Sequence, residues 1–173
     1  MSVGEPAEVP SQASMMIRFE NGNEIFNYRV VGVAVHQGSV LLHQAEGDPF
    51  WVLPGGRAEF GEPAEQTLLR EMREEIDTDV EVVRPLWFVE SFFTYADSRD
   101  HELALYFLMS LPINSKYLVK PGPFQAVDGE TQLTFRWFSR QPEVLSALPL
   151  LPSFLQTALQ TLPESIQHVI QYD

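Results

Sequence analysis

Three glutamates in the middle of the chain, Glu71, Glu74 and Glu75, are spaced so that they would share one face of a helix. Like charges three or four residues apart on a helix destabilise it by roughly a few tenths of a kcal/mol per pair. A bound cation would offset this repulsion. Because oxygen ligands suit magnesium and manganese better than zinc, the spacing predicts a site for Mg²⁺, with Mn²⁺ as the alternative. A solvated, glutamate-rich helix face is the other interpretation of the spacing alone.

The distribution of charge supports a cation site. The chain has 24 acidic residues against 11 Lys and Arg, a net charge of −13. The stretch from Gly55 to Asp79 alone carries −5 of this charge. Such a chain repels nucleic acid polymers and anionic membranes, whose binding depends on Lys and Arg. We therefore expect a small-molecule partner rather than a nucleic acid polymer or a membrane.

Composition also limits the chemistry and the location. The sequence has no cysteine, which excludes disulfides, thiolate metal sites and a cysteine nucleophile. No apolar run approaches the ~18 residues that span a bilayer, and no signal peptide is visible. A length of 173 residues fits one domain. We expect a single cytoplasmic domain over residues 15–173, preceded by a disordered tail over residues 1–14 that is rich in Ser, Pro and Glu.

The glutamates are positioned by a helix that we predict from about Pro63 to Ile76. Proline suits the first turn, where no backbone donor is needed. Apolar residues follow one stripe at helical spacing: Ala64, Leu68, Leu69, Met72 and Ile76. Asp77 lies where a C-terminal cap is expected, and aspartate tolerates left-handed geometry better than most residues. The preceding segment 54–56 (Pro-Gly-Gly) lets a ligand approach the backbone closely and could supply a carbonyl oxygen to the metal.

Strands dominate the rest of the chain. Asn21-Gly22-Asn23 predicts a hairpin turn. Extended segments are predicted at 28–36, 39–44, 50–53, 80–83, 86–94, 101–111 and 132–138. Polar loops are predicted at 95–100 and 114–129, and two helices at 141–148 and 153–162, while 166–172 is ambiguous. This pattern indicates one α/β (α+β) domain.

The segment Gly56–Thr78 resembles the Nudix box, G-x5-E-x7-R-E-U-x-E-E-x-G-U, in which U is aliphatic. Seven positions match at the correct spacing: Gly56, Glu62, Arg70, Glu71, Met72, Glu74 and Glu75. Asp77 replaces the usual glycine and Thr78 replaces the final aliphatic residue. That glycine normally caps the helix, so the departure concerns the cap rather than the metal chemistry.

The resemblance implies a fold and a set of roles. Nudix proteins are αβα sandwiches around a mixed β-sheet, and most hydrolyse a nucleoside diphosphate linked to another moiety. By similarity, Glu71, Glu74 and Glu75 would bind the metal together with the Gly56 carbonyl. Arg70 would hold a glutamate in position. The family's first box glutamate is usually structural, which is the role implied for Glu62.

The general base and the substrate contacts are less determined. Glu75 is the first candidate for the base; Glu130, on a loop before a strand, is the alternative, and Glu102 is a further carboxylate outside the box. Candidate substrate contacts are Arg57, Phe92, His101 and Glu102. His101-Glu102 resembles a pair found in some Nudix proteins, although it could simply begin a strand. Aromatic side chains could stack on a base, but core packing explains them equally well.

Two functions are therefore compared. The first is an Mg-dependent hydrolase that cleaves a pyrophosphate bond in a small nucleoside diphosphate derivative, such as ADP-ribose, or in a nucleoside triphosphate. The second is a catalytically silent Nudix domain that binds a nucleotide as a sensor or regulator. The complete set of box carboxylates favours the enzyme. A homodimer is also expected by analogy with the family.

Overall fold

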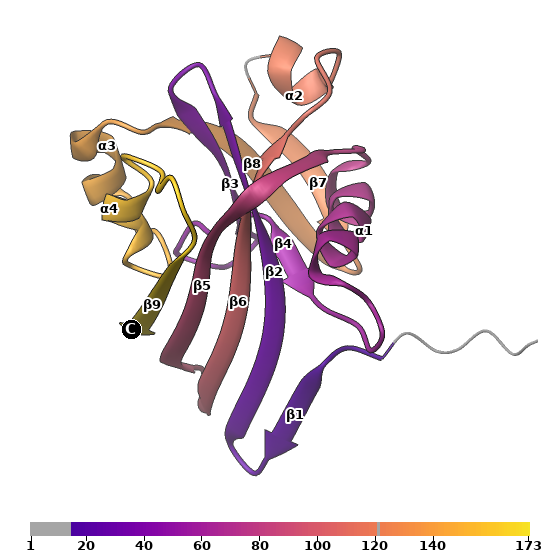
Figure 1. Ribbon diagram of the computed structural model, residues 1–173, viewed down its shortest axis with the longest axis vertical. Helices are drawn as coiled ribbons and strands as arrows, with labels where there is room; N and C mark the ends of the chain where they lie inside the picture. Colours follow the sequence, from indigo (N-terminus) through magenta and orange to yellow (C-terminus); the bar gives the residue numbers. More distant parts are fainter. Residues whose placement is uncertain (1–14, 121) are drawn as a thin grey trace, which may run out of the picture.

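The structure, a computed structural model, describes residues 15–120 and 122–173, which form one mixed sheet with helices on both faces (Figure 1). The strands are β1 (Arg18–Asn21), β2 (Glu24–His36), β3 (Ser39–Ala45), β4 (Gly55–Arg57), β5 (Glu81–Tyr95), β6 (Ser98–Ser110), β7 (Phe124–Asp128), β8 (Thr131–Ser139) and β9 (Gln167–Tyr172). The helices are α1 (Ala64–Ile76), α2 (Lys116–Val119), α3 (Pro142–Ala147) and α4 (Leu155–Ala158). The predicted tail, residues 1–14, lies outside the described residues.

The sheet is mixed because two of its strand pairs are parallel. The strand order is β7-β8-β3-β2-β6-β5-β9, and β1 and β4 also pair with β2. The pairs β2–β6 and β5–β9 are parallel, and the others are antiparallel. Segment 30–34 of β2 is buried on both faces, as its continuous apolar sequence predicts.

Each face of the sheet has its own core, which confirms the expected αβα arrangement. On one face, Leu68, Met72 and Ile76 of α1 pack in a cluster with residues of β2 and β6. On the other face, Leu145 of α3 and Leu155 of α4 pack in a second cluster. Figure 1 shows α1 and the α3–α4 pair on opposite sides of the sheet. None of the described helices is long and apolar enough to cross a membrane.

Helix α1 agrees closely with its prediction. It begins after Pro63 and ends at Ile76, and Asp77 forms the cap with φ 49° and ψ 49°. The backbone N–H groups of Asp77 and Thr78 donate to the carbonyls of Arg73 and Met72, which closes the helix end. An aspartate thus adopts the left-handed conformation that the family's glycine usually supplies.

Two predicted loops are wrong. Segment 95–100 is a tight turn rather than a loop, because β5 runs to Tyr95 and β6 begins at Ser98. Segment 114–129 contains α2 and β7, and Trp137 Nε1 donates to the Tyr117 carbonyl at 2.7 Å. Both segments are polar in sequence. Strand pairing orders the turn at 95–100 and the part that forms β7, and the hydrogen bond from Trp137 to Tyr117 anchors the part that contains α2.

The C-terminal region also differs from its prediction. The helix expected at 153–162 is reduced to α4, which covers only Leu155–Ala158. The ambiguous end of the chain is β9, which pairs in parallel with β5. In addition, β5 is continuous through Pro85, where a register shift accommodates the residue that has no backbone donor.

The cap of α1 provides a stability test. Asp77→Gly should raise the stability by about 0.5–1 kcal/mol, because glycine adopts positive φ without steric cost. For a chain of this size, that corresponds to a rise in Tm of about 1–4 °C. The matched control is Asp97→Gly, an exposed turn residue of the same type without positive φ. The control should lower Tm slightly, and equal shifts in both variants would contradict the role of the cap.

Candidate active site

Two glutamates of the predicted trio are buried against β4. Glu71 and Glu75 are only 8% and 6% exposed. A Cβ atom placed on Gly56 would lie 2.1 Å from the Glu71 carboxylate, so any larger residue at this position would displace that carboxylate. Oε2 of Glu75 is buried and has no hydrogen-bond partner. The result is a pair of carboxylates next to a backbone segment whose carbonyl groups could also contact a ligand.

Arg70 holds the box together from the side of the helix. Its Nε and Nη2 donate to Glu62 Oε1 and Oε2 at 2.9 and 3.0 Å. Its Nη1 donates to Glu71 at 2.7 Å and to Glu74 at 3.1 Å. Its Nη2 also donates to the Arg57 carbonyl at 3.0 Å, which ties α1 to β4. Arg70 is therefore a positioning residue in this geometry.

Glu74 differs from the other two glutamates. Its side chain is 58% exposed, and its described contact is with Arg70. Across residues 15–120 and 122–173, no three His, Asp or Glu side chains converge as a ready ligand set for a metal ion. The structure therefore supplies two buried carboxylates, and Glu74 lies one helical turn from Glu71 on the solvent side.

The electrostatics of the buried pair are unusual. Burial raises the pKa of Glu75 to about 8, and the neighbouring Glu71 adds to this rise. Arg29 and a hydrogen bond from the Gly55 backbone oppose it. Burial also raises the pKa of Glu71, against the opposing effect of Arg70. Strongly shifted carboxyl groups of this kind are common at functional sites, so both glutamates are candidates for a chemical role.

Arg29 connects the buried carboxylates to the opposite face of the sheet. Its Nη2 donates to the Gly55 carbonyl at 2.9 Å. Its Nη1 lies 4.0 Å from Glu102 Oε2. Because Arg29 interacts electrostatically with Glu71, Glu75 and Glu102, it lies between the acidic pair and the region around Glu102. A single cation there can attract an anionic group of a ligand.

A cavity of about 370 Å³ opens next to Arg29 and Glu102. Its walls are mostly apolar and come from β2, β5, β6, the segment 50–53 and the α4 region. Two buried polar side chains face it: Glu102, whose pKa is raised by burial, and Ser91, whose Oγ has no hydrogen-bond partner. Apolar walls with a few polar groups are typical of sites for small molecules.

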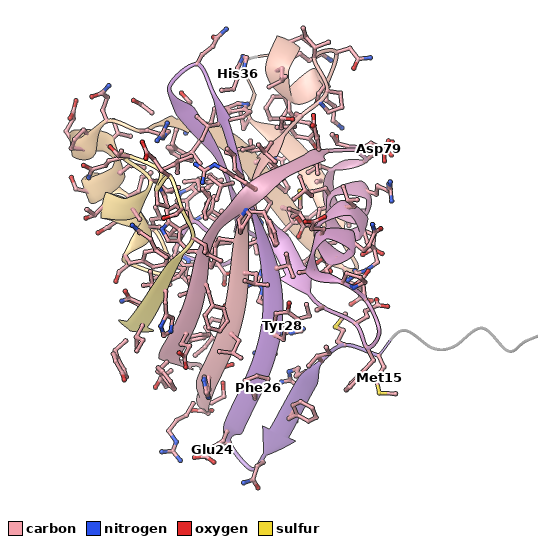
Figure 2. The ribbon with its side chains drawn as sticks, viewed as in Figure 1. Met15, Glu24, Phe26, Tyr28, His36 and Asp79 are labelled. Atoms are coloured by element: carbon pink, nitrogen blue, oxygen red, sulfur yellow. The ribbon has the colours of Figure 1, made fainter. Side chains whose placement is uncertain are left out.

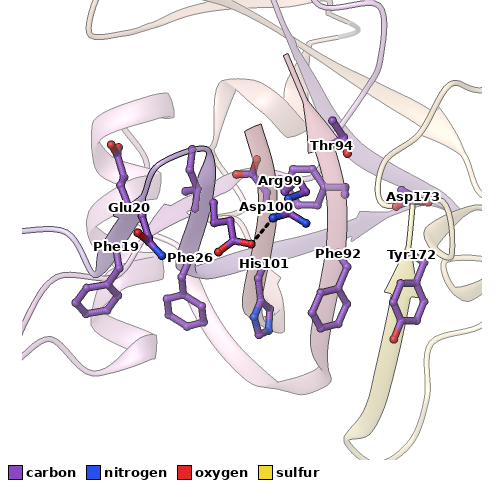
Figure 3. A pocket seen from close by; sticks show the side chains of 14 residues that line it. Phe19, Glu20, Phe26, Phe92, Thr94, Arg99, Asp100, His101, Tyr172 and Asp173 are labelled. Atoms are coloured by element: carbon purple, nitrogen blue, oxygen red, sulfur yellow. Dashed lines mark hydrogen bonds and ion pairs between the residues drawn. The ribbon is translucent and has the colours of Figure 1, made fainter. Parts of the chain in front are cut away.

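The predicted substrate contacts are divided between two surfaces. Glu102 lines the cavity, whereas His101 and Phe92 stack on each other at 4.4 Å on the other face of the sheet (Figure 3). Arg57 donates through Nε to Asn27 Oδ1 at 3.0 Å. The division follows from strand geometry, because consecutive residues of β6 point to opposite faces.

The alternative base, Glu130, lies exposed on the turn between β7 and β8. Asp128, two residues earlier, is the carboxylate from this hairpin that interacts electrostatically with Glu75. The sequence analysis did not single out Asp128, Arg29 or Ser91. The alternation of buried and polar residues on β2 could have indicated Arg29, since it is a lone cation inside an apolar strand.

Comparison with known proteins decides the family. The model of the NUDIX domain matches residues 27–151, which is more than half of the chain. The chain belongs to the NUDIX family. No curated protein sequence matches this NUDIX chain closely enough to count as a relative.

Solved structures confirm the NUDIX fold. An ADP-ribose pyrophosphatase from Streptococcus suis aligns with TM-score 0.55 and 18% identity, over 84% of this chain and 98% of that one. A MutT protein from Bacillus halodurans aligns with TM-score 0.55 and 18% identity, over 84% and 89%. A UDP-X diphosphatase aligns with TM-score 0.54 and 18% identity, over 83% of this chain and only 66% of that one. At these identities the likeness establishes the fold.

The pKa of Glu75 leads to a prediction for the metal-free protein. The folded state binds this proton more tightly than the unfolded state, whose pKa is near 4.5. The resulting stabilisation is complete below pH 4.5 and is lost as the pH rises through about 8. Glu75→Gln stays neutral, so by pH 9 it should be more stable than the parent by an amount on the order of a few kcal/mol.

Urea unfolding from pH 5 to pH 9 in the presence of a chelator measures this difference. The control is Glu65→Gln, which removes an exposed carboxylate from the same helix. Its stability curve should run parallel to that of the parent protein. If the curve of Glu75→Gln is also parallel to that of the parent protein, the pKa of Glu75 is not raised in the folded state.

Proposed function

We propose that this NUDIX protein is a divalent-cation-dependent hydrolase that cleaves the pyrophosphate bond of a small nucleoside diphosphate derivative. The observation that carries the proposal is the buried pair of Glu71 and Glu75, packed against Gly56 and joined through Arg29 to a cavity. Family membership and the neighbours named as an ADP-ribose pyrophosphatase and a UDP-X diphosphatase support the class of substrate.

The chemistry of the donor atoms suits a magnesium ion, although Glu74 would have to turn from Arg70 toward the buried pair to complete the ligand set. Every donor is an oxygen, as Mg²⁺ prefers. The unpartnered Oε2 of Glu75 is a feature that a bound cation would explain. Glu71, Glu75, the Gly56 carbonyl and the adjacent Glu74 would hold the ion. When bound, Mg²⁺ neutralises phosphate charge and lowers the pKa of a water molecule.

The protein's own residues supply the remaining steps. Arg29 attracts a phosphate oxygen, because its guanidinium is the cation between the acidic pair and the cavity. Glu75 is also the candidate base for the attacking water, because a bound cation would lower its pKa from about 8 and leave the carboxylate ionised at neutral pH. Arg70 holds the side chains of Glu62 and Glu71 in place and ties α1 to β4.

We assign the cavity to the part of the substrate that lies away from the pyrophosphate bond. Its volume of about 370 Å³ falls at the small end of ligand sites, which suits one nucleoside or sugar rather than a polymer. Phe93 and Tyr95 stand in its wall and provide apolar area for a planar ring. Ser91 and Glu102 offer hydrogen bonds at its interior, so they would select among substrates.

The alternative function is a catalytically silent nucleotide sensor. The absence of a convergent three-residue ligand set among the described residues is the observation that favours it. A panel of nucleoside triphosphates and nucleotide sugars, incubated with Mg²⁺ or Mn²⁺, separates the two functions. Release of phosphate or of a nucleoside monophosphate supports the hydrolase. Tight binding with no turnover by any compound would support the sensor and refute the hydrolase.

The box glutamates provide the direct test of the chemistry. Glu74→Gln and Glu75→Gln should each lower kcat by at least about 100-fold at saturating Mg²⁺, because each removes a negative charge from the cation site. Glu65→Gln is the control on the exposed face of α1 and should retain full activity. Near-normal rates in both box variants would refute the assignment of these residues.

The cavity gives a separate prediction. Ser91→Ala should raise KM by about 3- to 10-fold and leave kcat nearly unchanged, because it removes one hydrogen bond to the substrate. The free protein should become no less stable, since Ser91 Oγ has no partner in the described structure. Ser110→Ala on the exposed end of β6 is the control. An unchanged KM would show that the substrate does not form a hydrogen bond with Ser91 in this cavity.

A further inference from the structure

A row of four polar side chains crosses the face of the sheet that carries the cavity beside Arg29. The row runs over paired positions of β2, β6, β5 and β9, and its members in that order are Asn27, Glu102, Ser91 and Gln171. Phe26 and Tyr28, which Figure 2 shows on β2, flank Asn27, so their side chains point to the opposite face. The row is thus a polar strip beside a cavity whose walls are mostly apolar.

The two outer members of this polar row are paired within the protein. Asn27 Oδ1 accepts a hydrogen bond from Arg57 Nε at 3.0 Å. Gln171 Nε2 donates to Ser153 Oγ at 2.9 Å. Both amides therefore help to hold neighbouring elements together, and the two central members of the row, on β6 and β5, remain to be explained.

The central members, Glu102 and Ser91, are buried in the wall of the cavity. They are 8% and 3% exposed, and both line the cavity. Ser91 Oγ has no hydrogen-bond partner among the described residues. The ion pair of Glu102 Oε2 with Arg29 Nη1 spans 4.0 Å, which is beyond hydrogen-bonding distance. Since an unpaired buried polar group is costly, a ligand that pairs with both side chains gains affinity at this point.

Hydroxyl groups are the ligand groups that suit this pair. A hydroxyl both donates and accepts, so it can pair with Ser91, and with Glu102 whether or not the carboxyl group is ionised. Burial raises the pKa of Glu102, and the neighbouring Arg29 and Arg57 oppose this rise. A ligand edge with a fixed pattern of donors would depend on that balance, whereas two hydroxyls on adjacent carbons would not. Acidic side chains bind ribose hydroxyls in this way in dinucleotide-binding folds.

The short distance between Glu102 and Arg29 places these hydroxyls next to a phosphate. Under the proposed function, Arg29 attracts a phosphate oxygen, and Glu102 lies 4.0 Å from its guanidinium group. In a nucleotide the sugar is bonded directly to the phosphate, and the base lies on the far side of the sugar. The group at Glu102 is therefore a sugar, while a base would extend toward the aromatic part of the wall, formed by Phe50, Phe93 and Tyr95.

We propose that Glu102 and Ser91 bind the vicinal hydroxyls of the sugar attached to the pyrophosphate, so that the cavity selects ribosyl over deoxyribosyl compounds. The proposal rests on the proposed function, because it uses the same cavity and the same phosphate contact at Arg29. Glu102 pairs with both hydroxyls, and Ser91 donates to one of them. Such a diol has two sources in a nucleoside diphosphate derivative: the ribose of the nucleoside and the sugar of the second moiety.

Pairs of ligands that differ by one oxygen atom test this proposal without turnover. Isothermal titration with Mg²⁺ compares the α,β-methylene diphosphates of adenosine, guanosine and uridine with their 2′-deoxy forms, and ribose 5-phosphate with 2-deoxyribose 5-phosphate. The ribosyl member should bind about 10- to 100-fold more tightly, because its partner loses a hydrogen bond to a charged group. A preference among the diphosphates assigns the diol to the nucleoside, and one limited to the sugar phosphates assigns it to the second moiety. Equal affinities within every pair would overturn the proposal.

Variants of the two side chains locate the preference. Glu102→Ala should bind the ribosyl and deoxyribosyl members of each pair within about 3-fold of each other, and Ser91→Ala, the milder change, should reduce the preference about 3- to 10-fold. The matched control is Glu90→Ala, which removes a carboxylate that pairs with His168 on the opposite face of β5. The control should keep the full preference. An undiminished preference in Ser91→Ala and in a folded Glu102→Ala protein would overturn the proposal.

The same ligands separate this proposal from the proposed function. A preference for ribosyl ligands without hydrolysis of any compound retains the sugar contact and refutes the hydrolase. Hydrolysis of ribosyl and deoxyribosyl substrates with equal kcat/KM retains the hydrolase and overturns the sugar contact. Failure of every ligand pair to bind would also overturn the sugar contact.

Discussion

The burial of two carboxylates against β4 is the constraint on which much of this structure depends. Moving an ionised carboxyl group out of water is costly unless cations or donors compensate it. The compensation here comes from separate elements: Arg70 on α1, Arg29 on β2 and the backbone of Gly55 on β4. Because all three must meet Glu71 and Glu75 within hydrogen-bonding or short electrostatic range, the helix, the strand and the turn before the helix are fixed relative to one another.

The alternation of side chains along the strands separates two surfaces of the molecule. On β6, Glu102 faces the cavity and Arg29, while His101 stacks on Phe92 on the other face of the sheet. On β2, Arg29 lines the cavity, while Phe26 meets the ring of His101 edge-on on the other face. Residues that are neighbours in sequence therefore lie on different surfaces. The sequence suggests that His101 and Glu102 act together as one substrate contact, but the fold places their side chains on opposite faces of the sheet.

Local features of the fold could be predicted, and long-range pairings could not. The extent of α1, its cap at Asp77 and the hairpin at Gly22 follow from residues close together in sequence, and the structure agrees. The parallel pairing of β9 with β5 joins segments about 80 residues apart, and no local pattern specifies it. The same limit applies to the site: Arg29 and Asp128 reach Glu75 only through sheet register, which the box does not encode.

The distribution of charge bears on how an acidic chain could hold an anionic ligand. Negative charge concentrates on residues 55–79, which carry −5, and bound divalent cations would offset it there. Since the period of a strand is two, one face of β2 and β6 can present aromatic side chains while its reverse carries Arg29 and Glu102. The same sheet can thus carry polar groups toward the cavity on one face and aromatic side chains on the other.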